Sequence, residues 1–140
     1  MTRTVTDPQI IFENEIGETT GFKRSKAYYV GSERTITLSL HTGTGTAVGQ
    51  KLRVYGSIKT LGNRGIDPVD INEDVSSDNA FAPLLLSNLT DGCYTSGKEG
   101  ITIKASANGL YEVTTRGLSY VYFEIEGSGV PVTLLIRTYN

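Results

Sequence analysis

The sequence predicts an all-β protein, a single antiparallel β-sandwich of about seven or eight strands. In several short segments apolar residues alternate with polar ones, as in strands that have one buried and one solvent-facing side. Segments containing glycine, asparagine and aspartate separate these runs, and such residues accept the backbone angles of tight turns. The 140 residues include 16 glycines and 8 tyrosines but no tryptophan. This composition favours a β-rich domain with many turns.

Residues 100–140 carry the clearest alternation. They are expected to form two hairpins, with turns at Asn108-Gly109 and at Gly127-Ser128-Gly129. The alternation assigns these residues to the buried side: Ile101, Ile103, Ala105, Tyr111, Val113, Val121, Phe123, Ile125, Val132, Leu134 and Ile136.

Two further strands are predicted upstream, at residues 34–40 and 51–58. Their buried residues are expected to be Ile36, Leu38, Leu40, Leu52 and Val54. Strands of this length and spacing are typical of an immunoglobulin-like or a jelly-roll sandwich, and the strand order stays open between them.

The chain is expected to have an extended N-terminal arm, residues 1–20, followed by the sandwich domain, residues 21–140. Within the arm, Ile10-Ile11-Phe12 is either an edge strand or an extension packed on the domain, and the acidic residues 13–20 resemble a turn. Residues 59–80 form the longest irregular stretch, and loops of that length in a compact domain are usually functional or mobile.

Composition and charge exclude several classes of partner and compartment. The formal net charge is −2, whereas binding to nucleic acid normally requires a basic surface. No apolar run reaches the length of a membrane span, and the N-terminus has no apolar core of a signal peptide. The single cysteine, Cys93, excludes an internal disulfide. We therefore expect a protein made in the cytoplasm that binds neither nucleic acid nor membrane.

No residue pattern indicates catalysis or a cofactor. The glycine-rich loop after His41 has Gln50 where a P-loop requires its second glycine. The acidic run from Asp70 departs from a calcium-binding loop at its sixth and twelfth positions, Val75 and Phe81. An irregular calcium site there remains an alternative to an acidic, solvated loop. We expect no enzymatic activity and no cofactor.

The most informative surface prediction concerns tyrosine. If the apolar partners in the alternation face the core, then Tyr120, Tyr122, Leu135 and Tyr139 face outward. On adjacent antiparallel strands these four side chains would form one exposed patch, suited to a protein interface or a sugar platform. The alternative is that a long loop, such as residues 59–80, folds over this part of the sheet.

The pattern of turns and alternating strands in residues 108–125 resembles that of a known class of proteins. The strands Asn108-Gly109-Leu110-Tyr111-Glu112-Val113 and Gly117-Leu118-Ser119-Tyr120-Val121-Tyr122-Phe123-Glu124-Ile125, followed by Gly-Ser-Gly and an all-β terminus, resemble small accessory structural proteins of tailed bacteriophages. Capsid decoration, or cement, proteins are the nearest type, and the likeness extends from about residue 51 to the C-terminus.

The resemblance implies a non-enzymatic virion protein that binds and stabilises the capsid shell, often as a trimer. It would be a homo-oligomer that contacts capsid or other virion proteins, and Ile10, Ile11 and Phe12 in the arm would reach neighbouring subunits. The alternative function is a tail-associated carbohydrate- or receptor-binding β-sandwich module that uses the exposed tyrosines and the long loops. The virion component that is contacted and any calcium or sugar binding by residues 59–80 stay open.

Overall fold

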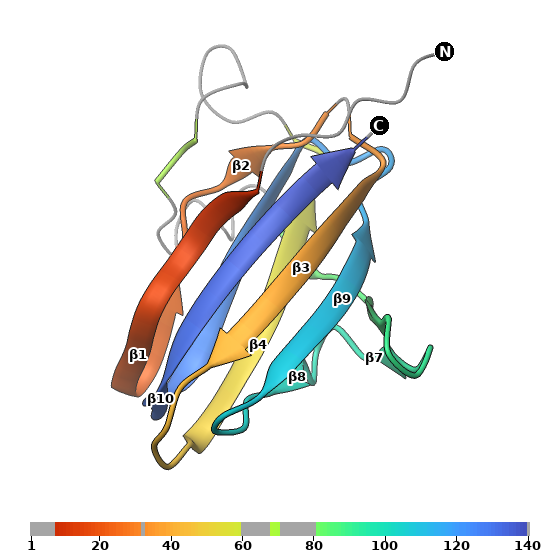
Figure 1. The fold of residues 1–140 in the computed structure, drawn as a ribbon. Coiled ribbons are helices and arrows are strands. Elements are labelled where there is room, and N and C mark those ends of the chain that lie inside the picture. Colours follow the sequence, from red (N-terminus) through yellow and green to blue (C-terminus); the bar gives the residue numbers. More distant parts are fainter. Residues whose placement is uncertain (1–7, 32, 60–67, 71–80, 140) are drawn as a thin grey trace.

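The computed structural model describes residues 8–31, 33–59, 68–70 and 81–139, and its regular structure is entirely β (Figure 1). All pairings between strands are antiparallel, which confirms the predicted all-β, antiparallel class. The strands are β1 (Gln9–Arg24), β2 (Tyr28–Tyr29), β3 (Thr35–Thr42), β4 (Val48–Ser57), β5 (Ala82–Pro83), β6 (Leu86–Asn88), β7 (Tyr94–Thr95), β8 (Ile101–Thr102), β9 (Asn108–Thr114) and β10 (Tyr120–Tyr139).

The strands form one strongly curled sheet, organised around β10. Residues 120–126 of β10 pair with β4, residues 132–139 pair with β3, and β1 pairs with both parts of β10. Figure 1 shows β10 running down the back of the molecule and returning along the front. We call residues 132–139 with β3, β9 and the start of β1 the front half, and residues 120–126 with β4, β5 and β8 the rear half. The predicted sandwich of two separate sheets is therefore corrected to a single sheet that curls over itself.

The curl is located at the glycines of β10. Gly127-Ser128-Gly129 was predicted to be a hairpin turn, but the strand continues through it, with Ser128 paired to Val48 of β4 and to Gly17 of β1. The two parts of β10 do not pair with each other. Gly127 and Gly129 have φ angles of 78° and 120°, which side-chain-bearing residues rarely adopt, and these angles let the strand bend while its neighbours stay paired.

A buried glutamine joins three strands at this bend. The Gln50 side chain accepts a hydrogen bond from the Val130 backbone N–H at 2.8 Å. Its amide group donates to the carbonyl oxygens of Val130 at 3.0 Å and Ile16 at 3.2 Å. These bonds satisfy backbone groups of β10 and β1 at the point where the bend interrupts regular pairing, and unsatisfied buried groups of this kind are costly.

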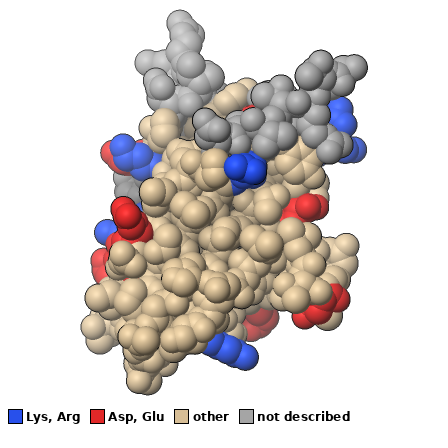
Figure 2. Space-filling model, in the orientation of Figure 1, with Lys and Arg blue, Asp and Glu red and all other residues tan. Residues whose placement is uncertain are grey.

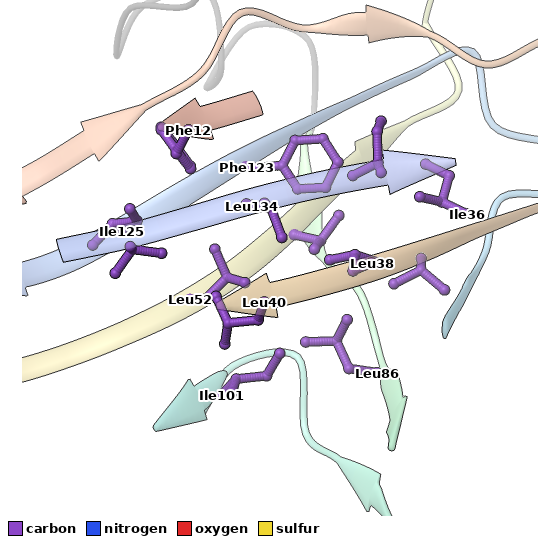
Figure 3. Close-up of a cluster of buried hydrophobic side chains, with 14 of the residues drawn as sticks. Phe12, Ile36, Leu38, Leu40, Leu52, Leu86, Ile101, Phe123, Ile125 and Leu134 are labelled. Carbon is purple, nitrogen blue, oxygen red and sulfur yellow. The ribbon is translucent and has the colours of Figure 1, made fainter. Parts of the chain in front are cut away.

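The hydrophobic core lies inside the curl, between the front and rear halves (Figure 3). Side chains from both parts of β10, such as Phe123 and Leu134, meet those of β3 and β4 there. The alternation predicted these buried residues correctly: Ile36, Leu38, Leu40, Leu52, Val54, Ile101, Ile103, Val113, Val121, Phe123, Ile125, Val132, Leu134 and Ile136. Two assignments were wrong, because Ala105 is exposed in the loop after β8 and Tyr111 is half-buried.

The described part of the predicted arm is a strand of the sheet. Residues 9–24 pair along β10 of the same chain, with several register shifts, so the acidic residues 13–20 do not form the predicted turn. The predicted boundary at residue 20 falls inside β1. Most of the predicted loop 59–80 lies outside the described residues; within it, Val69 forms a bridge with Ala27.

Candidate interaction surface

The outer side of the front half is a continuous piece of sheet surface, defined by the pairing of β10 with β3 and of β3 with β9. We call it the front face: the outward-facing residues of β10 after Gly129, of β3 and of β9, extended by Ile10 of β1 and by Ser87 and Leu89 at β6. The sequence builds it by simple alternation. In β10, Leu134 and Ile136 point into the core, so Leu135 between them points outward.

Apolar side chains form a row across the front face, perpendicular to the strands. The register places Ile10 beside Leu135, Leu135 beside Ser39, and Ser39 beside Leu110. Leu89 extends this row, because its backbone N–H donates to the Leu110 carbonyl oxygen at 2.9 Å. Ile10, Leu110 and Leu89 are 54%, 49% and 47% exposed, so this row offers apolar surface to a partner.

The neighbouring row contains the two charges of the face. Thr37 lies at its centre and pairs with Arg137 on one side and with Glu112 on the other. Ser87 and the exposed Tyr94 continue the row beyond Glu112. Figure 2 views the molecule from the front and shows a broad area free of charged side chains, with charges mainly toward its margins.

The front face is hollowed on both sides of β3. One hollow of about 320 Å³ is lined mainly by Leu135, Arg137, Thr37 and Ser39. A second, of about 210 Å³, lies beside Glu112 and Tyr94. The apolar row is therefore raised beside shallow hollows, and the side chains of another protein can pack into these hollows.

The structure distributes the residues predicted for the interface over different surfaces. Ile10 and Leu135 lie together on the front face, and Tyr139 lies at its end, paired with Thr35 of β3. Ile11 is half-buried against the core, and Phe12 is a core residue with 5% of its surface exposed. The role of these residues in an interface stays a prediction.

The predicted exposure of Tyr120 and Tyr122 is wrong. They are 0% and 3% exposed and form a second buried cluster with Ala27, packed against Tyr55 and two further residues, Val69 and Phe81. The Tyr122 ring stacks on Tyr55, with centroids 4.8 Å apart and planes 8° from parallel, while Phe81 meets its edge. Alternation did place both tyrosines on the side away from the main core. That side is covered by Tyr55 of β4, by Val69 from within the predicted loop 59–80 and by Phe81 just after it, so the four predicted residues do not form one patch.

A buried carboxylate lies next to this aromatic cluster, and sequence reasoning missed it. Glu124 is 2% exposed, and its carboxylate accepts a hydrogen bond from Arg24 Nε at 2.9 Å and one from the Tyr55 hydroxyl at 3.2 Å. Arg53 Nη1 lies 3.7 Å from the same carboxylate and 2.8 Å from that of Glu126. The alternation indicated a solvent-facing glutamate, and the only signal of its partners was an arginine in each of the two strands beside it.

Replacing Tyr55 by phenylalanine should reduce the fall in the free energy of unfolding that occurs at alkaline pH. Burial, and then the negative charge of Glu124, raise the pKa of the Tyr55 phenol above its ordinary 10.0. The unfolded chain therefore loses this proton first, and the free energy of unfolding falls as pH rises from about 10 through the higher native pKa. At about pH 8, Tyr55→Phe should cost about 1–2 kcal/mol, because a hydrogen bond to a carboxylate is lost.

Urea unfolding at about pH 8 and about pH 11 would measure this effect, with Tyr94→Phe as the exposed control. The fall in stability between the two pH values should remain for the control and be smaller for Tyr55→Phe. An equal fall in all three proteins would contradict the assignment. Burial also raises the pKa of Tyr28, so some alkaline loss should persist in every variant.

The described residues contain little else that suggests chemistry. His41 contacts the Asn108 side chain on the surface of the sheet, and Cys93 is exposed. In the described part of the chain, no three histidine, cysteine, aspartate or glutamate side chains gather as a metal site would require. No helix among these residues is long and apolar enough to cross a membrane. Most of the predicted acidic loop after Asp70 lies outside the described residues.

Fold and surface together define a class: an antiparallel β protein with one curled sheet and an exposed, largely uncharged face. No protein-family model matches the sequence, and comparison with curated proteins finds no match. Among solved structures, the crystal structure of SPBc2 prophage-derived protein YomS is similar along the whole chain. The match covers 100% of this chain and 96% of that chain, with a TM-score of 0.58 and 15% sequence identity. At this identity the likeness extends to the fold alone.

Proposed function

We infer that this protein is a non-enzymatic structural component of a phage virion, which binds and stabilises the capsid shell as a decoration protein. The observation that carries the proposal is the apolar row Ile10, Leu135, Ser39 and Leu110 across the exposed front face. Soluble proteins seldom leave large apolar patches open unless they serve as binding surfaces. Contact between proteins accounts for such a face directly, since the centre of an interface is poor in charge.

The fold supports the phage setting. A prophage-derived protein shares it over nearly the full length of both chains. The sequence resemblance to accessory virion proteins agrees with that setting and adds the capsid as the partner. Because function depends on the site rather than on the fold, the front face carries the proposal and the fold only supports it.

The alternative, a carbohydrate- or receptor-binding module, loses most of the feature that suggested it. Sugar platforms use exposed aromatic rings on which the sugar ring stacks. Two of the three rings proposed for that purpose, Tyr120 and Tyr122, are buried against Tyr55 and Phe81, and only Tyr139 stays partly exposed, at the end of the front face. The face that stays open carries mainly aliphatic and hydroxyl side chains, which suit protein assembly better.

Leu135→Asp should weaken binding to the particle at least about tenfold while the protein stays folded. Leu135 lies at the centre of the apolar row, and placing a charge there forfeits burial worth about 1.5–3 kcal/mol, which weakens binding by about tenfold or more. Ile58→Asp is the matched control, because Ile58 is 75% exposed at the end of β4, outside the front face. Co-sedimentation with particles assembled without the protein measures binding, and circular dichroism checks the fold. Equal binding by both variants would refute the use of this face.

A further inference from the structure

We propose that the front face binds the front face of a second copy of this chain, through a two-fold axis that runs along β3. The inference rests on the proposed function in taking the front face as the assembly surface. A second copy covers this face in the free protein, and the capsid takes that copy's place when the protein binds the shell. In such a dimer, side chains on the β10 side of β3 in one copy face side chains on the β9 side of β3 in the other. Each row of side chains therefore faces the same row of the second copy.

The apolar row has the symmetry that this axis requires. Ser39 lies at its centre, with Leu135 on one side and Leu110 on the other. Ile10 lies outside Leu135, and Leu89 lies outside Leu110. The two-fold axis places Leu135 against Leu110 of the second copy, and Ile10 against Leu89 of the second copy. Every large apolar side chain of the row then meets another one.

The neighbouring row carries one positive and one negative side chain, at two positions that the same axis exchanges. Arg137 and Glu112 lie on either side of Thr37, two strands apart. That separation is about 10 Å between the two backbones. Among the described residues neither side chain takes part in an ion pair or hydrogen bond. The axis along β3 brings Arg137 of each copy against Glu112 of the other, which makes two reciprocal ion pairs.

The shape of the face agrees with this arrangement. Leu110 is half exposed, and the hollow of about 320 Å³ lies beside Leu135, lined by Ser39 and Thr37. Leu110 of the second copy is placed over that hollow. β10, β3 and β9 contribute three strands about eight residues long and about 4.8 Å apart, and shorter pieces of β1 and β6 flank them. Together they give a face of about 500 Å², or about 1,000 Å² buried by both copies. This size fits a weak, reversible dimer.

The competing two-fold arrangement lacks these matches. In that arrangement the two-fold axis lies in the plane of the interface and runs perpendicular to the strands. It would place β10 on β10 and β9 on β9. No glutamate would then face Arg137, because Glu112 lies on β9. The pairing of unlike charges therefore distinguishes the two geometries, and mutation can test it.

The test reverses each charge alone. In a dimer of Arg137→Glu both contacts become glutamate against glutamate, and in a dimer of Glu112→Arg both become arginine against arginine. Sedimentation equilibrium should show a self-dissociation constant about tenfold or more above wild type for each variant. The exposed Lys104→Glu, outside the front face, is the control and should dimerise like wild type.

Mixing the two single variants gives the decisive result. Their heterodimer restores both ion pairs, one in the wild-type orientation and one with the two charges exchanged, so native mass spectrometry of the mixture should find heterodimers in large excess over either homodimer. The double variant Arg137→Glu with Glu112→Arg should regain wild-type dimerisation. A wild-type protein that stays monomeric, dimers indifferent to both reversals, a trimer, or a mixture without heterodimer preference would each overturn the proposal.

These measurements use the protein alone, so they separate the inference from the proposed function. A monomer that still binds particles through Leu135 would refute the dimer and leave the virion role standing. A dimer with the predicted charge rescue that does not bind particles would support the inference and refute the role.

Discussion

Gly129→Ala should lower the free energy of unfolding by about 2–6 kcal/mol. Two costs combine at this position. Its φ of 120° is a conformation that alanine adopts only with strain of about 1–3 kcal/mol. A Cβ atom there would also lie 1.9 Å from the Thr46 carbonyl oxygen, a backbone atom that cannot rotate away. Forcing the two segments apart adds an overpacking cost of similar size.

Gly49→Ala separates the two costs, because Gly49 lies at the same bend and also has a positive φ, of 61°. Nothing lies within 4 Å of the position that its Cβ would take. This control should lose only about 1–2 kcal/mol, the cost of the left-handed conformation. Urea denaturation of both variants measures the difference. Equal losses would mean that the close approach of β10 to Thr46 does not hold the bend together.

The bend explains why the architecture was predicted only in part. In sequence, Gly127-Ser128-Gly129 between two alternating runs has the form of a hairpin turn. What makes it a bend within one strand is pairing on both edges, with Val48 on β4 and Gly17 on β1. Those partners are far away in the chain, and local turn preferences carry no information about them. The long alternating strands β3, β4 and β10 were therefore predictable, but the curling of one sheet was not. The predicted turn at Asn108-Gly109 was wrong, because these residues begin β9, which pairs with β3.

The same limit applies to burial. Alternation correctly separated Phe123 and Ile125, on the core side, from Tyr122 and Glu124 on the other side. It cannot tell whether a second layer covers that other side. Here Phe81 and other side chains cover Tyr122, and two arginines surround Glu124.

The front face was predictable where no other described residues cover the sheet. Leu135 was predicted to face outward because its neighbours on either side face the core. The strand register of the structure then places Ile10 beside it. Leu110 and Glu112 were not singled out, although the same alternation in residues 108–114 contains the signal. Their significance comes from lying beside β3, which only the pairing of β3 with β9 reveals.

Glu124→Gln is expected to cost about 3 kcal/mol of unfolding free energy. The carboxylate is buried and holds Arg24 at 2.9 Å, with Arg53 at 3.7 Å. An amide keeps the shape and one acceptor oxygen, but it removes the charge that compensates two arginines. Breaking a fully buried pair costs about 3–5 kcal/mol. The arginine side chains keep 23% and 13% of their surface exposed, so solvent screens them in part and the low end of that range applies.

Glu126→Gln is the matched control, because the same chemical change is made two residues along β10 on the same side of the strand. Glu126 also pairs with Arg53, at 2.8 Å, but its side chain is 33% exposed. Water can replace what it loses, so the cost should be about 1 kcal/mol or less. Thermal and urea unfolding of both variants at neutral pH measure the contrast. If the two glutamines cost the same, Glu124 is solvated in solution and the cluster around it is open. A threefold difference in the loss of unfolding free energy, as expected, would instead show that the Arg24–Glu124–Arg53 cluster stabilises the packing of β1 and β4 on the rear part of β10.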